Sequence, residues 1–131
     1  MIVVDASALL EVLLNTSDAG PVGDRLFGHG DSLHAPHLID LEVAQVLRRY
    51  TLSGSMDPHR GRQSLEDFAD IPLHRYPHDL FLPRVWDLRN NLTAYDAAYV
   101  ALAEALDAPL VTRDEALARA GGHHARVEVL K

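Results

Sequence analysis

Short apolar runs recur along this chain and alternate with longer segments that have the periodicity of helices. Residues 2–4 are Ile-Val-Val, and residues 110–112 form a similar run, Leu-Val-Thr. Strands that are apolar on both sides are buried on both faces, which is typical of a parallel sheet covered by helices. The alternation therefore predicts an α/β fold in which helices lie on both sides of a parallel sheet.

The pattern predicts every element from its local periodicity and its turn residues. We expect strands at residues 2–4, 32–35, 72–76, 110–112 and 127–130. We expect helices at residues 6–14, 20–27, 36–52, 58–69, 77–89, 93–106 and 115–119. Pro36 suits the first turn of its helix, whereas Pro83 weakens the first part of the helix at 77–89. The length of 131 residues fits a single domain spanning residues 1–131.

Four acidic residues stand at the ends, or on the apolar side, of these elements. Asp5 ends the first strand, Asp114 follows the strand at 110–112, and Asp96 opens an almost wholly apolar helix, while Glu42 lies within the apolar arc of its helix. Ligand sites form beyond the carboxyl ends of parallel strands. Carboxylates that converge there repel one another by about 4 kcal/mol per close pair, a cost that a divalent cation removes. Oxygen ligands of this kind suit Mg²⁺ or Mn²⁺.

Each acid also has a purely structural interpretation. Asp5 and Asp114 can cap the helices that follow them, and Asp96 can form a capping box with Thr93. A salt bridge to an arginine would account for Glu42, but capping does not, because Glu42 lies inside its helix. Taken together, the four acids favour a metal site over four unrelated structural roles.

Composition narrows the possible chemistry. The chain has no cysteine, so disulfides, thiolate zinc sites and a cysteine nucleophile are excluded. Lys131 is its single lysine, which excludes a P-loop lysine. The net charge of −7 argues against tight, nonspecific DNA binding but leaves room for local basic patches. Because no apolar run approaches the length of a membrane span, we expect no membrane association and a cytoplasmic protein.

The four acids lie in the segments VVDASA at 3–8, LEV at 41–43, YDAAYVALAE at 95–104 and PLVTRDE at 109–115. In these segments the sequence resembles the PIN-domain ribonucleases, and more narrowly the VapC-type toxins of bacterial toxin–antitoxin pairs. The third is the most specific. The order and spacing of the segments agree with the family over nearly the whole chain.

The resemblance implies a three-layer α/β/α fold with a five-stranded parallel sheet. It also implies an acidic quartet that binds Mg²⁺ or Mn²⁺ and activates water, namely Asp5, Glu42, Asp96 and Asp114. Asp5 and Asp96 would be the core ligands, Glu42 would hold the metal or orient the attacking water, and Asp114 would complete the site. Small hydroxyl residues, Ser7 and Thr112, would support these acids. Because Glu115 follows Asp114, either of these two can be the fourth acid.

The function implied is that of a metal-dependent endoribonuclease, the toxin of a toxin–antitoxin pair. Its substrate would be RNA, with tRNA and rRNA as the expected classes, and its partners a second copy of the chain and a VapB-type antitoxin. Arg48, Arg49 and Arg113 can contact phosphates, although Arg48 and Arg49 equally suit a solvated helix face. The alternative is a catalytically silent PIN-like binding or regulatory module, and a phosphatase on a related sheet is a third possibility.

Overall fold

The computed structural model describes residues 1–131 and contains one five-stranded sheet in which every pairing is parallel. The strands lie side by side in the order β3-β2-β1-β4-β5. Their bounds are β1 Ile2–Val4, β2 Leu33–Pro36, β3 Leu73–Tyr76, β4 Leu110–Thr112 and β5 Val127–Val129. Val3 of β1 pairs with His34 on one side and with Leu110 on the other. The predicted parallel sheet and its five strands are confirmed.

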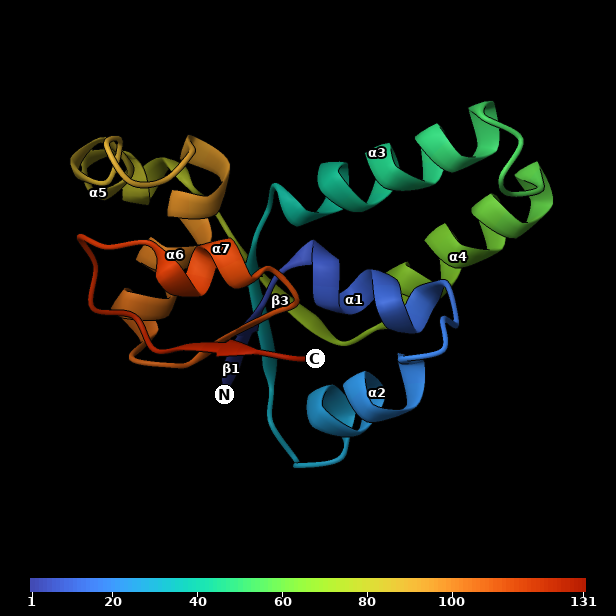
Figure 1. Ribbon diagram of the computed structural model, residues 1–131, viewed down its shortest axis with the longest axis horizontal. Helices are drawn as coiled ribbons and strands as arrows, with labels where there is room; N and C mark the ends of the chain where they lie inside the picture. Colours follow the sequence, from blue (N-terminus) through green and yellow to red (C-terminus); the bar gives the residue numbers. More distant parts are fainter.

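Helices connect the successive strands and cover both faces of the sheet (Figure 1). Their bounds are α1 Ala6–Leu13, α2 Ala19–Phe27, α3 Ile39–Leu52, α4 Pro58–Asp70, the 3₁₀ turn η1 Asp79–Phe81, α5 Leu82–Asp87, α6 Ala94–Leu106 and α7 Glu115–Arg119. Right-handed crossovers place α1 to α4 on one face and α5 to α7 on the other. The three-layer arrangement follows from this handedness and from the strand order.

The core lies where β1 and β4 pass between the two helical layers. Every residue of both strands is buried, whereas β5 at the edge of the sheet is only partly covered. Helix α6 packs on β1, β2 and β4, and seven consecutive residues from Ala97 to Ala103 are buried. This burial explains why the helix is apolar nearly all round.

One expectation about a proline is wrong, and one about a helix is confirmed only in part. Pro36 is the last residue of β2, where it pairs with Tyr76, and α3 begins only at Ile39. A proline suits that position because β1 ends before it. No residue of β1 therefore needs a backbone N–H from this position as a hydrogen-bond donor. The helix expected at 77–89 is instead a 3₁₀ turn followed by the short α5, with Pro83 in the first turn of α5. No helix is long and apolar enough to cross a membrane.

The strand order reverses direction between β1 and β4. From β1 the chain proceeds to β2 and β3 on one side, then returns to β4 and β5 on the other. The helices that follow β1 and β4 therefore leave toward opposite faces and open a crevice at the carboxyl ends of these strands. Asp5 and Thr112 lie at this switch point, so the topology brings together residues that are far apart in the sequence.

Candidate active site

Asp5 is the buried centre of the candidate site, with only 9% of its surface exposed. It caps α1, because its Oδ1 accepts a hydrogen bond from the Ala8 N–H at 3.2 Å. The Ser7 hydroxyl donates to the same oxygen at 2.6 Å, and the Thr112 hydroxyl donates to Oδ2 at 2.5 Å. Capping and a role in the site are therefore compatible, since both oxygens are oriented while Oδ2, which has one donor, keeps a lone pair free.

Ser7 and Thr112 also connect Asp5 to the loop after β4. The Ser7 hydroxyl accepts the Arg113 N–H at 3.0 Å, and the Thr112 hydroxyl accepts the Asp114 N–H at 3.0 Å. The two hydroxyl oxygens lie 3.4 Å apart. This network sets the orientation of Asp5 relative to the backbone that carries Asp114.

Glu42 projects from α3 and is half-buried. No arginine pairs with it, and the Tyr99 hydroxyl of α6 donates to its Oε1 at 2.5 Å. Burial and the Glu42 charge raise the pKa of Tyr99, so its hydroxyl stays protonated and serves as the donor. Sequence reasoning missed this role of Tyr99. The signal was a hydroxyl on an otherwise apolar helix, three residues after Asp96 and therefore on a neighbouring part of the helix surface.

Asp96 lies in the first turn of α6, where Thr93 is the N-cap and accepts the Asp96 N–H at 3.2 Å. Half of the expected capping box is thus present. Burial raises the pKa of the Asp96 carboxyl, and the charge of Asp114 raises it further, while the Thr93 hydroxyl acts in the opposite direction. Asp96 therefore combines a structural role at the helix end with an electrostatic link to the next acid.

Asp114 is exposed and caps α7 by accepting the Ala116 N–H at 2.9 Å. Its neighbour Glu115 is directed along α7 toward Arg119, with which it forms an exposed ion pair at 3.5 Å. It is Asp114 that acts on the pKa of Asp96. Of the two candidates for the fourth acid, the geometry favours Asp114.

The four carboxylates interact electrostatically. Burial raises the pKa of Asp5, and the Asp96 charge adds to that rise. Burial likewise raises the pKa of Glu42, with further contributions from Asp5 and Asp96. Mutual repulsion of this kind is what a bound cation relieves, and a set of oxygen donors fits Mg²⁺ or Mn²⁺. No three acidic or histidine side chains are yet close enough to enclose an ion. The donor set thus fits such a cation in its chemistry, although its members do not form a closed shell.

Arg113, one of the arginines expected to contact phosphates, is engaged with other groups of the chain. Its guanidinium pairs with Asp18 at 2.8 Å and with Glu11 at 3.5 Å, and it donates to the Leu130 carbonyl at 3.1 Å. These contacts fasten the loop after β4 to the α1–α2 connection and to the C-terminal strand. Arg113 therefore stabilises the backbone beside the site and has little freedom to bind a substrate.

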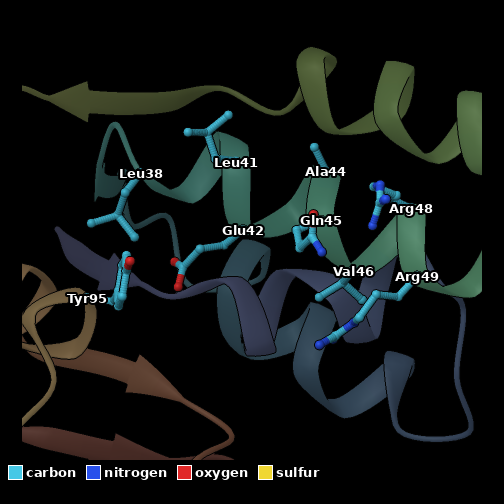
Figure 2. Close-up of a pocket in the computed structure, with 9 residues that line it drawn as sticks. All are labelled: Leu38, Leu41, Glu42, Ala44, Gln45, Val46, Arg48, Arg49 and Tyr95. Carbon is cyan, nitrogen blue, oxygen red and sulfur yellow. The ribbon is translucent and has the colours of Figure 1, made fainter.

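An open groove, here the α3 groove, starts beside the candidate site. It has a volume of about 690 Å³ and is lined by Glu42 and Tyr95, by apolar side chains of α3, and by Arg48 and Arg49. Figure 2 shows Tyr95 and the Glu42 carboxylate together at one end and the two arginines at the other. The side chains of Arg48 and Arg49 are exposed, as expected for a solvated helix face.

Comparison with known proteins agrees with this geometry. The PIN domain family model matches residues 2–123. Ribonuclease VapC9 of Mycobacterium tuberculosis is 45% identical over 121 residues, which cover 92% of this chain and 91% of that protein. Ribonuclease VapC12 of the same species is 39% identical over 130 residues and 99% of each chain.

A solved toxin–antitoxin complex from Klebsiella pneumoniae contains a chain of the same fold. It superimposes with a TM-score of 0.65 over 87% of each chain, at 17% sequence identity. Because that identity is low, the likeness concerns the fold alone. The family match and the two sequence relatives carry the assignment, and this chain belongs to the PIN-domain family and, within it, to the VapC ribonucleases.

Proposed function

We propose that this chain is a metal-dependent endoribonuclease, the toxin of a toxin–antitoxin pair, which hydrolyses phosphodiester bonds in RNA. The observation that carries the proposal is the electrostatic coupling of Asp5, Glu42, Asp96 and Asp114: burial raises the pKa of each of the first three, and the charges of other acids in the set add to each rise. The VapC relatives, named as ribonucleases, support the RNA substrate.

The residues have distinct roles in this proposal. Asp5 and Asp96 are the core ligands, and Asp114 completes the site from its exposed side. Glu42 uses Oε1 to accept the Tyr99 hydroxyl, which leaves Oε2 to hold the ion or to orient the attacking water. The ion, Mg²⁺ or Mn²⁺, would lower the pKa of water and stabilise the leaving oxygen.

The expected partners follow from the family. A toxin–antitoxin complex is among the structures with this fold, which supports a VapB-type antitoxin as the partner of this chain. We also propose a homodimer as the assembled form and tRNA or rRNA as the substrate class. Sequencing RNA ends after brief expression identifies which RNA is cut and where.

The test is cleavage of purified cellular tRNA and rRNA by the wild-type protein in Mg²⁺ or Mn²⁺, with and without EDTA. Cleavage should depend on the metal, and Asp5→Asn should reduce it to the level seen in EDTA. Asp57→Asn is the matched control, because Asp57 caps α4 away from the site and asparagine caps equally well. Equal cleavage by wild type and Asp5→Asn would exclude this catalytic role of Asp5.

One observation favours the alternative of a silent binding or regulatory module, namely that the acids do not enclose an ion as they stand. The same assay separates the two functions. If no RNA is cut in an EDTA-sensitive manner, the binding module is the better description. Turnover of a small phosphate ester with intact RNA would instead indicate a phosphatase.

A further inference from the structure

Three arginines of this chain have no partner for their guanidinium groups, and all three lie on α3 and α4. Arg48, Arg49 and Arg62 are exposed, and their guanidinium groups take part in none of the ion pairs or hydrogen bonds of the structure. The other arginines are engaged with carboxylates, carbonyl oxygens or both: Arg25, Arg60, Arg75, Arg84, Arg89, Arg113, Arg119 and Arg126. Apart from Lys131 at the C-terminus, the unpaired positive charge of the Lys and Arg side chains therefore lies on α3 and α4.

The free arginines line two hollows that adjoin each other. Arg48 and Arg49 belong to the α3 groove, while Arg48 also borders a second hollow of about 280 Å³ between α3 and α4, which Arg62 lines as well. Arg48 is thus common to both. The path runs from the candidate site at Glu42, along α3, to the space between α3 and α4. Six residues of helix separate Glu42 from Arg48, or about 9 Å along the axis.

Tyr95 stands at the other end of the α3 groove, next to Asp96. Its side chain is 66% exposed, and no hydrogen bond holds its hydroxyl. Leu38 and Leu41 line the same groove, and Leu41 is 76% exposed. An exposed aromatic ring on an apolar floor is a surface on which a nucleobase can stack.

We propose that the α3 groove and the adjoining α3–α4 hollow bind an unpaired RNA segment, with a base stacked on Tyr95 beside the acids and the following phosphates held by Arg48, Arg49 and Arg62. The proposal rests on the proposed ribonuclease function and names the substrate-binding residues of that site. Acidic and basic functions are segregated along α3. Glu42 lies at the cation-binding end, where a phosphate approaches only with a metal ion, and the arginines lie where a phosphate is attracted directly.

Charge and shape favour RNA over other occupants. A polyanion matches three free guanidinium groups in a chain of net charge −7, and each group is suited to phosphate. Stacking on Tyr95 requires an unstacked base, which single strands and loops supply and a continuous duplex does not. An acidic protein segment would match the arginines but would make no use of stacking on Tyr95.

The test measures binding without cleavage, by fluorescence anisotropy of a short labelled single-stranded RNA of mixed sequence in EDTA. The triple variant Arg48→Ala/Arg49→Ala/Arg62→Ala should bind at least about tenfold more weakly, and its salt dependence should fall by about 0.7 in log–log slope per lost contact. Tyr95→Ala should weaken binding by about tenfold, whereas Tyr95→Phe should not. A duplex of the same sequence should bind more weakly and should not respond to Tyr95→Ala.

Arg126→Ala is the matched control, because it removes one exposed positive charge at the opposite edge of the sheet. It should leave RNA affinity unchanged, and thermal unfolding should confirm that every variant is folded. If the groove variants bind RNA like the wild type, the proposal is wrong. It is also wrong if they lose affinity only for an acidic peptide.

The measurement separates this proposal from the proposed activity. Groove-dependent RNA binding without metal-dependent cleavage would contradict the ribonuclease function and leave the binding path intact. If cleavage depends on metal but its KM is the same for the wild type, the triple variant and Tyr95→Ala, the proposed RNA-binding path is wrong. The ribonuclease function would then stand. Weaker binding by the arginine variant with no effect of Tyr95→Ala would overturn the stacking role.

Discussion

The Tyr99 hydroxyl donates a hydrogen bond of 2.5 Å to Glu42 Oε1 and so joins α6 to α3 across the candidate site. Tyr99 is buried, with 2% of its surface exposed, so its position is determined by the core. The hydrogen bond from this fixed hydroxyl restricts the Glu42 side chain, which would otherwise have several rotamers. Two of the four acids, Asp96 and Glu42, are in this way tied to the same helix.

Replacing Tyr99 by phenylalanine removes this donor with little change in shape. We expect the free energy of unfolding to fall by about 1–2 kcal/mol, because a half-buried carboxylate loses its hydrogen bond. The pKa of Glu42 should rise further, since the Tyr99 hydroxyl lowers it. RNA cleavage should decrease, and the acidic limb of its pH–rate profile should move to higher pH. Urea denaturation and the pH profile are the measurements.

Tyr50→Phe is the control for Tyr99→Phe, because Tyr50 lies on α3 with an exposed hydroxyl that bonds to no other residue. It should match the wild type in both measurements. An unchanged pH profile for Tyr99→Phe would mean that the hydroxyl does not influence Glu42 during turnover.

The choice between Asp114 and Glu115 can be settled by two isosteric variants. Asp114→Asn keeps the N-cap of α7, because asparagine caps as well as aspartate, so any effect reports on charge. We expect it to reduce cleavage by about tenfold and to weaken the dependence on metal concentration. Glu115→Gln should change neither, since Glu115 pairs with Arg119 at the surface. The reverse result would assign the fourth acid to Glu115.

Metal should stabilise the fold more strongly as the pH rises. Asp5, Glu42 and Asp96 have folded-state pKa values above their ordinary values of 3.8 and 4.5. The folded state therefore binds protons more tightly than the unfolded state, and these groups reduce the stability of the metal-free protein as the pH rises through their folded-state pKa values. Mg²⁺ or Mn²⁺ binds the ionised groups and reverses this loss.

The measurement is the difference in melting temperature between Mn²⁺ and EDTA, at about pH 5 and about pH 7. The difference should be larger at neutral pH, and Asp5→Asn should reduce it. Carboxylates outside the site titrate equally in Mn²⁺ and in EDTA, so their contribution cancels in the difference between the two melting temperatures. If the difference in melting temperature is the same at both pH values, and the same in Asp5→Asn as in the wild type, the ion binds elsewhere.

Glu104 should contribute stability with the opposite dependence on pH. It accepts two hydrogen bonds from Arg84, at 2.8 and 2.9 Å, and one from the His124 N–H, and its side chain is 7% exposed. The Arg84 hydrogen bonds lower the pKa of Glu104 to about 2, from an ordinary value of 4.5. The stabilisation is thus complete above pH 4.5 and is lost as the pH falls toward 2.

Glu104→Gln should therefore lower the free energy of unfolding by about 2 kcal/mol at neutral pH and by progressively less in acid. Urea denaturation across this range checks the trend. Glu66→Gln is the control, because Glu66 is exposed on α4 and unpaired, and it should have no effect at any pH. A constant difference between wild type and Glu104→Gln would mean that the Glu104 charge is not what stabilises the fold.

Periodicity was sufficient to predict the order of strands and helices, because buried strands and amphipathic helices leave different patterns along the chain. It failed at Pro36 and at residues 77–89. A proline is accepted at a strand end as readily as in the first turn of a helix, and the local sequence does not say whether a neighbouring strand needs its N–H. That information lies in the pairing of strands from distant parts of the chain.

The sequence by itself determined where each acid stands on its own element: Asp5 and Asp114 after strands, Asp96 in a first turn, Glu42 on an apolar stripe. Only the tertiary structure decided what each side chain meets. It paired Glu42 with Tyr99, engaged Arg113 in ion pairs, and left Arg48, Arg49 and Arg62 free. The physical reason is the distance along the chain over which each interaction acts. Periodicity and capping act within a few residues, whereas hydrogen bonds and charge pairs across the crevice depend on the packing of elements far apart in the chain.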